Sequence, residues 1–309
     1  MSNVPTAKLN SGYEIPLIGY GTFGGNDAPE QVYNAAKAAL DAGYRHFDTA
    51  YIYQTEEALG KAIKESNVPR EELFITTKLW QYFHEPEHVR PVFERSLKLL
   101  QMDYVDMYMI HWPISWAFKS YEFSELKATK DMEPTNVPII DTWREMEKLV
   151  EDKKARSIGV SNFTIPMLED LLSKCSIPPA VNQVEINNAF PQEELLAYCK
   201  SKNILLTAYS PLGNPGYRKS VRATLEDPVI LDIAKKYNKT PGQVVLNWGV
   251  NRGYAVIPKS TTPSRIQANL VYFKMDESDV EAITALGREH PFRSCNPEEM
   301  WGPKNKIFD

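Results

Sequence analysis

Four titratable side chains stand near the ends of short apolar segments, where they can meet in a folded chain. Asp48 lies in the segment RHFDTA, and Tyr53 follows it. Lys78 lies near the end of LFITTKLW, and His111 near the end of YVDMYMIHW. Taken singly, each has an ordinary structural explanation, such as a helix cap, an exposed lysine or a packed ring. Together they indicate a shared site, because packing alone does not require four ionisable groups in one place.

These residue types suit proton transfer by a tyrosine. A tyrosine with a pKa of about 10 is a poor proton donor near neutral pH unless a nearby ammonium stabilises its phenolate. Lys78 can supply that ammonium, and a partly buried lysine needs a carboxylate partner such as Asp48 to stay charged. We therefore predict that Tyr53 is a general acid tuned by Lys78, and that His111 hydrogen-bonds either a substrate oxygen or Tyr53.

A tuned proton donor suits the reduction of a carbonyl group. The sequence shows no metal-ligand spacing, carboxylate nucleophile or activated serine, so hydrolysis is disfavoured and no metal is predicted. No protein side chain donates hydride, so a nicotinamide or flavin must supply it. Ser161, Asn162 and Gln183 are suited to hold a carboxamide, and Tyr209 offers a flat face on which a ring can stack.

A second candidate site follows the last apolar segment, in IPKSTTPSRIQANL. Hydroxyl groups, free backbone N–H groups at a helix start and two cations together form an anion site. A capped helix with exposed charges explains the same residues without a ligand. The side chains concerned are Lys259, Ser260, Thr261, Thr262 and Arg265.

The elements that position these residues alternate between strands and helices. Eight apolar segments, separated by stretches with helical periodicity, predict an α/β fold, a closed (β/α)8 TIM barrel formed by one domain, residues 1–309. A short N-terminal β-hairpin is expected before them, turning at NSG. The eight segments are residues 16–21, 45–50, 73–80, 104–112, 155–162, 179–186, 204–210 and 254–260.

A doubly wound open sheet is the structural alternative. Gly19, Gly21 and Gly24 have the GxGxxG spacing of a dinucleotide-binding turn. That motif requires the helix to start among the glycines, whereas here the helical stretch opens only at Pro29. We therefore interpret the glycines as a first barrel loop whose small residues let a ligand approach the backbone closely.

Three segments exceed ordinary loop length, namely residues 113–138, 211–226 and 288–309. The first two follow predicted strands, so we expect them to form pocket walls on the C-terminal face of the barrel. The substrate pocket itself is predicted to be apolar and aromatic. Its residues are Phe23, Trp80, His111 and Trp112, with Trp116, Phe118, Met300 and Trp301 either closing it or packing the long loops onto the rim.

Composition limits the partners and the compartment. The chain of 309 residues has a net charge of -5 and a pI of about 5.7, which gives no electrostatic reason to expect nucleic acid or membranes as partners. Cys175, Cys199 and Cys295 are scattered and predict free thiols in a reducing compartment. With neither a secretory signal nor a long apolar span in the sequence, we expect a cytoplasmic monomer or weak homodimer.

A series of motifs gives the sequence a resemblance to a known family. GYRHFDTAYIY, TKLW, MIHWP, RSIGVSNF, NQVE, AYSPLG and IPKS occur in the order and spacing of the aldo-keto reductase superfamily, close to its aldose and aldehyde reductase branch, and span nearly the whole chain. The resemblance implies a (β/α)8 barrel that reduces aldehydes, ketones or open-chain aldoses to alcohols with NADPH. It also implies a catalytic tetrad of Asp48, Tyr53, Lys78 and His111, in which Tyr53 is the acid.

The resemblance also implies where NADPH binds. Ser161, Asn162 and Gln183 would hold the carboxamide. Tyr209 would stack on the nicotinamide ring. The loop after that tyrosine contacts the pyrophosphate, and the last loop contacts the adenosine phosphate. In chain order, the implied cofactor residues are Gly21, Thr22, Asp48, Ser161, Asn162, Gln183, Tyr209, Ser210, Leu212, Lys259, Ser260, Thr261, Thr262, Arg265 and Asn269.

Two positions depart from the family pattern. Ala268 stands where many members carry an acidic residue for the adenine amino group, which leaves Gln267 as the nearest candidate for that contact. Phe23 stands where aldose reductases usually have a tryptophan. Lys259 and Arg265 still favour a 2′-phosphate, so NADPH is the expected cofactor, with the use of NADH left open.

Two other functions fit the same fold. A non-catalytic NADP(H)-binding regulatory or structural protein has no need of all four tetrad residues. A phosphate-binding isomerase or aldolase would use the last loop but leave the predicted nicotinamide residues unexplained. Reduction of a small carbonyl substrate accounts for both sets of residues.

Overall fold

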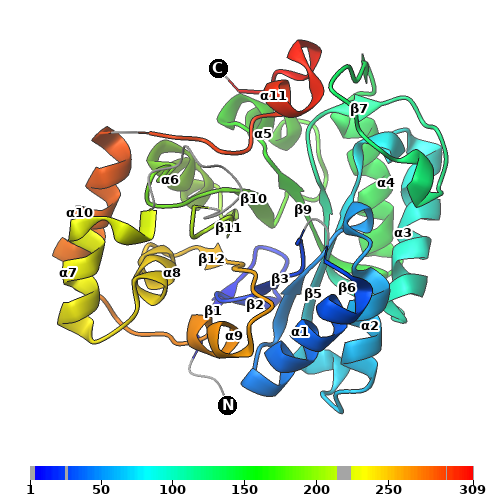
Figure 1. Ribbon diagram of the computed structural model, residues 1–309. Helices are drawn as coiled ribbons and strands as arrows, with labels where there is room; N and C mark the ends of the chain where they lie inside the picture. Colours follow the sequence, from blue (N-terminus) through cyan, green and yellow to red (C-terminus); the bar gives the residue numbers. More distant parts are fainter. Residues whose placement is uncertain (1–3, 25–26, 214–223, 290, 309) are drawn as a thin grey trace.

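The parallel sheet of the computed structural model closes into a barrel, as the sequence predicts (Figure 1). The structure describes residues 4–24, 27–213, 224–289 and 291–308. The two edge strands meet where Ile18 bridges Val256 in parallel, and Val256 N donates to Leu17 O at 2.8 Å. In sheet order the strands are β3 (Tyr20–Gly21), β4 (His46–Asp48), β5 (Phe74–Leu79), β6 (Val105–Ile110), β9 (Ala155–Ser161), β10 (Val181–Glu185), β11 (Leu205–Tyr209) and β12 (Ala255–Val256).

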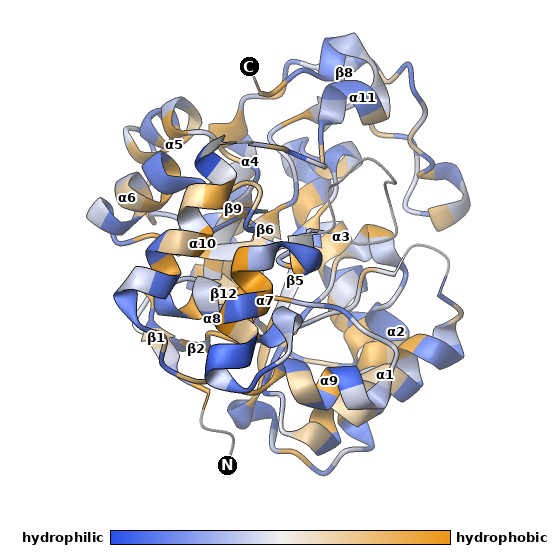
Figure 2. Ribbon diagram, turned by 60° about the vertical axis from the view of Figure 1, so that its left-hand side comes forward, coloured by the Kyte–Doolittle hydropathy of each residue, from blue (hydrophilic) through white to orange (hydrophobic). Residues whose placement is uncertain are grey.

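Helices follow the strands and surround the sheet (Figure 1). Their sequences mark their limits, since Pro29 opens α1 and Gly43 ends it with a φ of 101°. Figure 2 shows hydrophobic and hydrophilic residues on the same helices, as expected where one face is buried. The helices are α1 (Pro29–Ala42), α2 (Glu56–Lys64), α3 (Pro86–Leu100), α4 (Ile139–Glu151), α5 (Ile165–Leu172), α6 (Glu193–Ser201), α7 (Pro228–Tyr237), α8 (Pro241–Asn251), α9 (Pro263–Asn269), α10 (Glu277–Glu289) and α11 (Pro297–Trp301).

Within the described ranges, no helix is long and apolar enough to span a membrane. In the part of the chain that the structure describes, Cys175, Cys199 and Cys295 form no disulfide, as the sequence predicts. Short 3₁₀ helices connect several of the main elements. They are η1 (Tyr51–Tyr53), η2 (Arg70–Glu72), η3 (Gln81–Phe83), η4 (Phe123–Glu125), η5 (Thr224–Glu226) and η6 (Pro303–Asn305).

The predicted N-terminal hairpin closes one end of the barrel. Strands β1 (Thr6–Lys8) and β2 (Glu14–Pro16) pair antiparallel. Leu9 and Ile15 of this hairpin are buried in a small cluster separate from the main core. Their partners in that cluster include Phe74 and Val181, the first residues of β5 and β10, together with Met107, Met109 and Ala180. The hairpin therefore plugs the N-terminal end of the barrel and leaves the C-terminal rim for ligands.

The glycines after the first strand serve barrel packing and do not form a Rossmann turn. A Cβ at Gly19 would lie 2.5 Å from the His46 ring, and one at Gly21 would lie 2.8 Å from the carbonyl oxygen of Ile257. Helix α1 starts only at Pro29, outside the glycine run. Together with the closed sheet, this excludes the doubly wound alternative.

Two long segments are linked to each other at the C-terminal end of the barrel, where α11 and β7 lie near one another (Figure 1). Strands β7 (Ser115–Trp116) and β8 (Pro134–Thr135) pair antiparallel within the first segment. Asn305 of the C-terminal segment donates to Met132 O at 2.7 Å and accepts from Trp116 Nε1 at 2.9 Å. The predicted loop 211–226 lies mostly on residues 214–223, outside the described ranges.

Candidate active site

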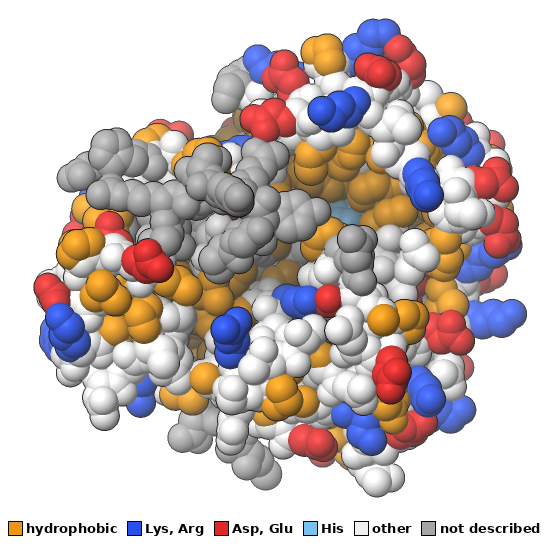
Figure 3. Space-filling model, viewed as in Figure 1, with side chains coloured by type: hydrophobic (Ala, Val, Ile, Leu, Met, Phe, Trp, Pro, Cys, Tyr) orange, Lys and Arg blue, Asp and Glu red, His pale blue; other side chains and the backbone are white. Residues whose placement is uncertain are grey.

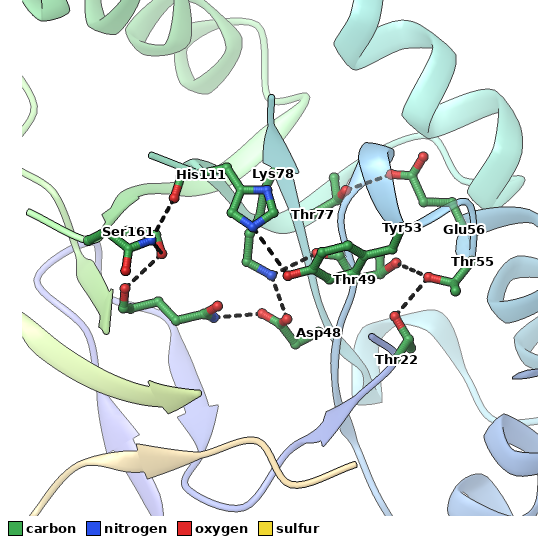
Figure 4. A network of polar contacts seen from close by, with 12 residues as sticks. Thr22, Asp48, Thr49, Tyr53, Thr55, Glu56, Thr77, Lys78, His111 and Ser161 are labelled. Atoms are coloured by element: carbon green, nitrogen blue, oxygen red, sulfur yellow. Dashed lines mark hydrogen bonds and ion pairs between the residues drawn. The ribbon is translucent and has the colours of Figure 1, made fainter. Parts of the chain in front are cut away.

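The four predicted catalytic residues meet at the C-terminal rim of the barrel (Figure 4). Asp48 is the last residue of β4, and Lys78 lies near the end of β5. His111 directly follows β6, and Tyr53 ends the 3₁₀ helix η1 that follows β4. Neighbouring parallel strands end at the same rim, so their terminal side chains face a common space.

Lys78 and Asp48 form a buried ion pair beneath this space. Lys78 is fully buried, and its Nζ donates to Asp48 Oδ1 at 2.5 Å and to Thr49 O at 2.9 Å. Burial lowers the pKa of Lys78, and the charge of Asp48 opposes this shift. The carboxylate therefore does what the sequence predicts, since it favours the charged form of a lysine that has no access to water.

Tyr53 is hydrogen-bonded to His111, with 3.2 Å between its hydroxyl oxygen and Nε2. The Lys78 Nζ lies 5.1 Å from the centre of the Tyr53 ring. Burial, followed by the charges of Asp48 and Cys295, raises the pKa of Tyr53 well above its ordinary value. In the chain alone, burial and the charge of Asp48 disfavour a phenolate at Tyr53, and the tuning of its hydroxyl by Lys78 stays a prediction. Tyr53 therefore holds its proton firmly.

The imidazole of His111 is neutral. Burial, reinforced by the charge of Lys78, holds the pKa of His111 well below its ordinary range. Within the described residues, its Nδ1 has no hydrogen-bond partner. A neutral ring beside Tyr53 can donate or accept one hydrogen bond at Nε2, depending on its tautomer.

The residues predicted to hold a carboxamide are joined to the ion pair. Gln183 Nε2 donates to Asp48 Oδ2 at 2.7 Å, and Ser161 Oγ donates to Gln183 O at 2.7 Å. Asn162 Nδ2 donates to His111 O at 3.0 Å. One network therefore runs from the tetrad across the ends of β9 and β10 (Figure 4).

Asn162 and Tyr209 extend this network to the next strand. The Tyr209 hydroxyl donates to Asn162 Oδ1 at 2.8 Å. Asn162 has a φ of 65° and Ser210 a φ of 47°, so both predicted cofactor residues adopt the left-handed conformation immediately after a strand. Such conformations in residues other than glycine concentrate at functional sites.

These groups fit a nicotinamide by the chemistry of their donors and acceptors. Buried amide and hydroxyl groups of Ser161, Asn162 and Gln183 match a carboxamide, which needs both kinds of partner. Half-buried Tyr209 keeps an aromatic face near them. Leu212 is half-buried just beyond Ser210.

Gly21 and Thr22, at the end of β3 and directly after it, make contacts that close the barrel and are not part of an open surface. Gly21 N donates to Pro258 O at 3.1 Å. The Thr22 hydroxyl is buried and lies 2.9 Å from the Thr55 hydroxyl, which in turn lies 2.9 Å from that of Thr49. Thr22 is therefore bonded to a hydroxyl cluster behind Asp48.

The predicted anion site is assembled around the start of α9. Lys259 and Ser260 are half-buried, whereas Thr261, Thr262 and Arg265 are exposed. Half-buried Asn269 ends the helix. The amino group of Lys259 is not free, because it forms an ion pair with Asp27 of the first loop. Nothing in the sequence spacing indicated this partner.

A cavity of about 490 Å³ is lined in part by Trp80, the residue that packs against His111 of the tetrad. Figure 3 shows hydrophobic side chains around a hollow with a histidine in it. Trp80 packs edge-on against His111, with ring centres 5.1 Å apart, and Trp112 packs against Trp301 at the same distance. Phe23 is 53% exposed and lies 4.8 Å from the Tyr53 ring. Phe23 thus lies beside the proposed acid and Trp80 beside its partner His111, whereas Phe23, His111 and Trp112 are not among the residues that line this cavity.

The residues of the long loops divide between the two roles that the sequence leaves open, closing the pocket and packing the loops onto the rim. Trp116 packs edge-on against Trp80 and Trp301, and half-buried Met300 packs against the main core. Phe118 does not line the cavity, because its ring stacks on His88 of α3 at 3.7 Å. Three residues that the sequence analysis does not name also line the cavity, namely Ile52, Phe123 and Leu126. The last two are apolar residues in a largely polar loop, which is the signal that the sequence offers for them.

The comparisons with known proteins agree with this geometry. The model of the Aldo/keto reductase family matches residues 17–288. The chain is 45% identical to a glycerol 2-dehydrogenase (NADP(+)) of Saccharomyces cerevisiae over 91% of this chain and 90% of that protein. It is 41% identical to a glyoxal reductase of Bacillus subtilis, with 96% and 97% covered.

The fold comparison gives the same answer. The aldose reductase of Schistosoma japonicum superposes with a TM-score of 0.89 at 37% identity, covering 98% of each chain. With its closed barrel, its buried lysine and aspartate pair and its tyrosine bonded to a histidine, the chain belongs to the aldo/keto reductase family.

Proposed function

We propose that this protein reduces aldehydes and ketones to alcohols with NADPH, and that Tyr53 is the general acid. The observation that carries the proposal is the Tyr53 to His111 hydrogen bond directly above the buried Lys78 and Asp48 pair. The family and the NADP(+) named in its relatives support the reaction class. The aldehyde reductase YPR1 of Saccharomyces cerevisiae, 40% identical over 92% of this chain, supports a carbonyl substrate.

The chain's own residues account for the proton half of the reaction. A carbonyl oxygen placed between Tyr53 and His111 accepts a hydrogen bond from the Tyr53 hydroxyl. Bound NADPH supplies the hydride to the carbonyl carbon. As negative charge grows on the oxygen, the Tyr53 proton moves to it, and Lys78 offsets the charge left on the phenolate. A positioned acid of this kind typically contributes about 10²-fold to 10⁴-fold in rate.

Cofactor selection in this proposal depends on the two ends of the nucleotide. Ser161, Asn162 and Gln183 hold the carboxamide, while Tyr209 packs against the ring. Lys259 and Arg265 favour the 2′-phosphate of NADPH over NADH, because each is a cation at the predicted anion site. NADH then binds more weakly, since it has no charge at that position.

The substrate is proposed to be a small carbonyl compound with an apolar part. The cavity of about 490 Å³ is lined by Trp80, Trp301, Phe123 and Leu126, which favour an aliphatic or aromatic group. Gln54 and Lys127 add polar groups at the same cavity, so hydroxylated aldehydes also fit. Cysteines outside disulfides support a reducing compartment such as the cytoplasm, and the acidic net charge gives no electrostatic reason to expect nucleic acid or membrane partners.

The decisive test follows the loss of NADPH absorbance with a panel of aldehydes, ketones and aldoses, and with NADH in parallel. We expect consumption of NADPH with at least one class of carbonyl, and slower consumption of NADH. Tight NADPH binding without turnover on any member of the panel would overturn the proposal and favour a non-catalytic nucleotide-binding protein.

A further inference from the structure

Asp27 and Lys259 form an ion pair across the seam of the barrel. Asp27 lies in the loop after β3 and Lys259 in the loop after β12, the two strands whose edges close the sheet. Gly21 N donates to Pro258 O at 3.1 Å, and the Tyr20 hydroxyl donates to Ser260 O at 2.7 Å, so the two segments are fixed side by side. The hydrogen bonds between the two segments therefore bring Asp27 and Lys259 close to each other in the folded chain.

The partial burial of both side chains and the close approach of the backbone at Gly24 also indicate that the fold positions this ion pair. The exposed fractions of the two side chains are 21% for Asp27 and 27% for Lys259. A Cβ at Gly24 would lie 2.6 Å from Lys259 Nζ and 1.9 Å from Asp27 Oδ2. The chain can pass this close to the pair only because residue 24 is glycine.

The second cation of the predicted anion site is different. Arg265 is exposed, and no carboxylate of the described residues lies within ion-pair distance of it. Within the part of the chain that the structure describes, Lys259 is the residue of the proposed adenosine phosphate site that pairs with an acidic group. Burial and, after it, the charge of Asp27 also raise the pKa of Tyr20, which places this carboxylate close to the same segment.

We propose that Asp27 is a specificity-determining residue that competes with the 2′-phosphate of NADPH for Lys259, an inference that rests on the proposed use of NADPH. A phosphate bound at Lys259 must displace or share this carboxylate, and the two anions repel each other. Asp27 therefore weakens NADPH binding more than NADH binding. It keeps the preference for NADPH moderate and speeds release of the bound nucleotide.

The test measures dissociation constants of NADPH and NADH by calorimetric titration for the wild type and for Asp27→Asn. Because the pair is partly exposed, we expect the Kd of NADPH to fall by about twofold to fivefold and that of NADH to change less. Asp152→Asn is the matched control, since Asp152 also forms an ion pair, with Arg90. Asp152 lies between α4 and the start of β9, at the end of the barrel opposite to the proposed nucleotide site. That control is expected to leave both constants unchanged.

A double-mutant comparison isolates the pair. Lys259→Met alone should weaken NADPH binding, and Asp27→Asn added to it should bring no gain, because no cation is left to release. Weaker NADPH binding in Asp27→Asn, an equal gain for NADPH and NADH, or a gain that persists with Lys259→Met would each overturn the inference. A wild-type protein that binds neither nucleotide would instead overturn the proposed function, and the inference with it.

Discussion

Gln183 Nε2 donates a hydrogen bond to Asp48 Oδ2 at 2.7 Å, and this contact crosses the interior of the barrel. Strands β10 and β4 are not neighbours in the sheet, since β9, β6 and β5 lie between them. The other oxygen of Asp48 accepts from Lys78. One carboxylate therefore joins the proposed acid site to the proposed carboxamide site.

The pair of Asp48 and Lys78 is expected to behave as a unit in stability measurements. Asp48→Asn leaves the fully buried Lys78 without a counter-charge, so we expect a loss of about 3 kcal/mol in the free energy of unfolding. Combining it with Lys78→Met should cost clearly less than the sum of the two single losses. Urea unfolding of the four proteins measures this, and additive losses would show that the two side chains are not coupled.

Tyr53→Phe removes the proposed proton donor and leaves the predicted cofactor contacts intact. We expect kcat to fall by at least about 100-fold, with the Kd of NADPH changed by less than about twofold. Tyr13→Phe is the matched control, because Tyr13 is 43% exposed and belongs to the terminal hairpin. Turnover close to that of the wild type in Tyr53→Phe would remove Tyr53 from the mechanism.

Glu56 is expected to make the stability of the fold depend on pH. It is buried at the start of α2, accepts from Thr77 Oγ1 at 2.5 Å, and burial raises its pKa to about 7 (Figure 4). Between an unfolded pKa of about 4.3 and this value, the folded state binds more protons than the unfolded state. Stability from this group is therefore complete below about pH 4 and is lost as the pH rises through about 7.

Glu56→Gln removes that dependence. The difference in unfolding free energy between variant and wild type should shift in favour of the variant by about 3 kcal/mol from pH 4.5 to pH 8, because about 2.5 pKa units are involved. Urea unfolding at several pH values measures the difference directly. A difference that stays constant with pH would show that Glu56 is ionised throughout.

Glu185 is predicted to position one wall of the substrate pocket. It is fully buried at the end of β10 and accepts from Ser294 Oγ at 2.6 Å, from Ser294 N at 2.9 Å and from Cys295 N at 2.8 Å. These contacts hold the segment that continues to Trp301. Glu185→Gln replaces an acceptor by a donor, so we expect the KM for carbonyl substrates to rise by about threefold or more.

Glu185→Gln should leave the Kd of NADPH within about twofold of the wild type, since the segment from Ser294 to Trp301 is not among the proposed nucleotide contacts. Glu193→Gln, which changes a surface partner of Arg288, serves as the control. If Glu185→Gln altered cofactor binding and left KM unchanged, the segment from Ser294 to Trp301 would not determine which substrates bind.

The strand ends could be predicted from the sequence because their logic is local. Apolar segments ending in Asp48, Lys78 and His111 need only the rule that parallel strands finish at one rim. The same rule predicts that Ser161 and Gln183 lie at this rim. It applies because a strand fixes the direction of its side chains within a few residues.

Features that depend on loops and burial could not be predicted in this way. The ion pair of Asp27 with Lys259 joins residues from opposite ends of the chain, and no pattern in either loop indicates it. Phe118 packs on His88 because of the path of a long segment. The direction of the pKa shift of Tyr53 depends on how completely its ring and Asp48 are shielded from water, which spacing does not reveal.

The bond between Trp116 and Asn305 has a consequence for how this enzyme can diversify. The two segments that surround the cavity are tied to each other, whereas the proton-transfer residues are held by strands and by one another. Selection can therefore exchange the linked segments as a matched set and alter the range of accepted substrates. The inherited chemistry at the rim is left unchanged by such an exchange.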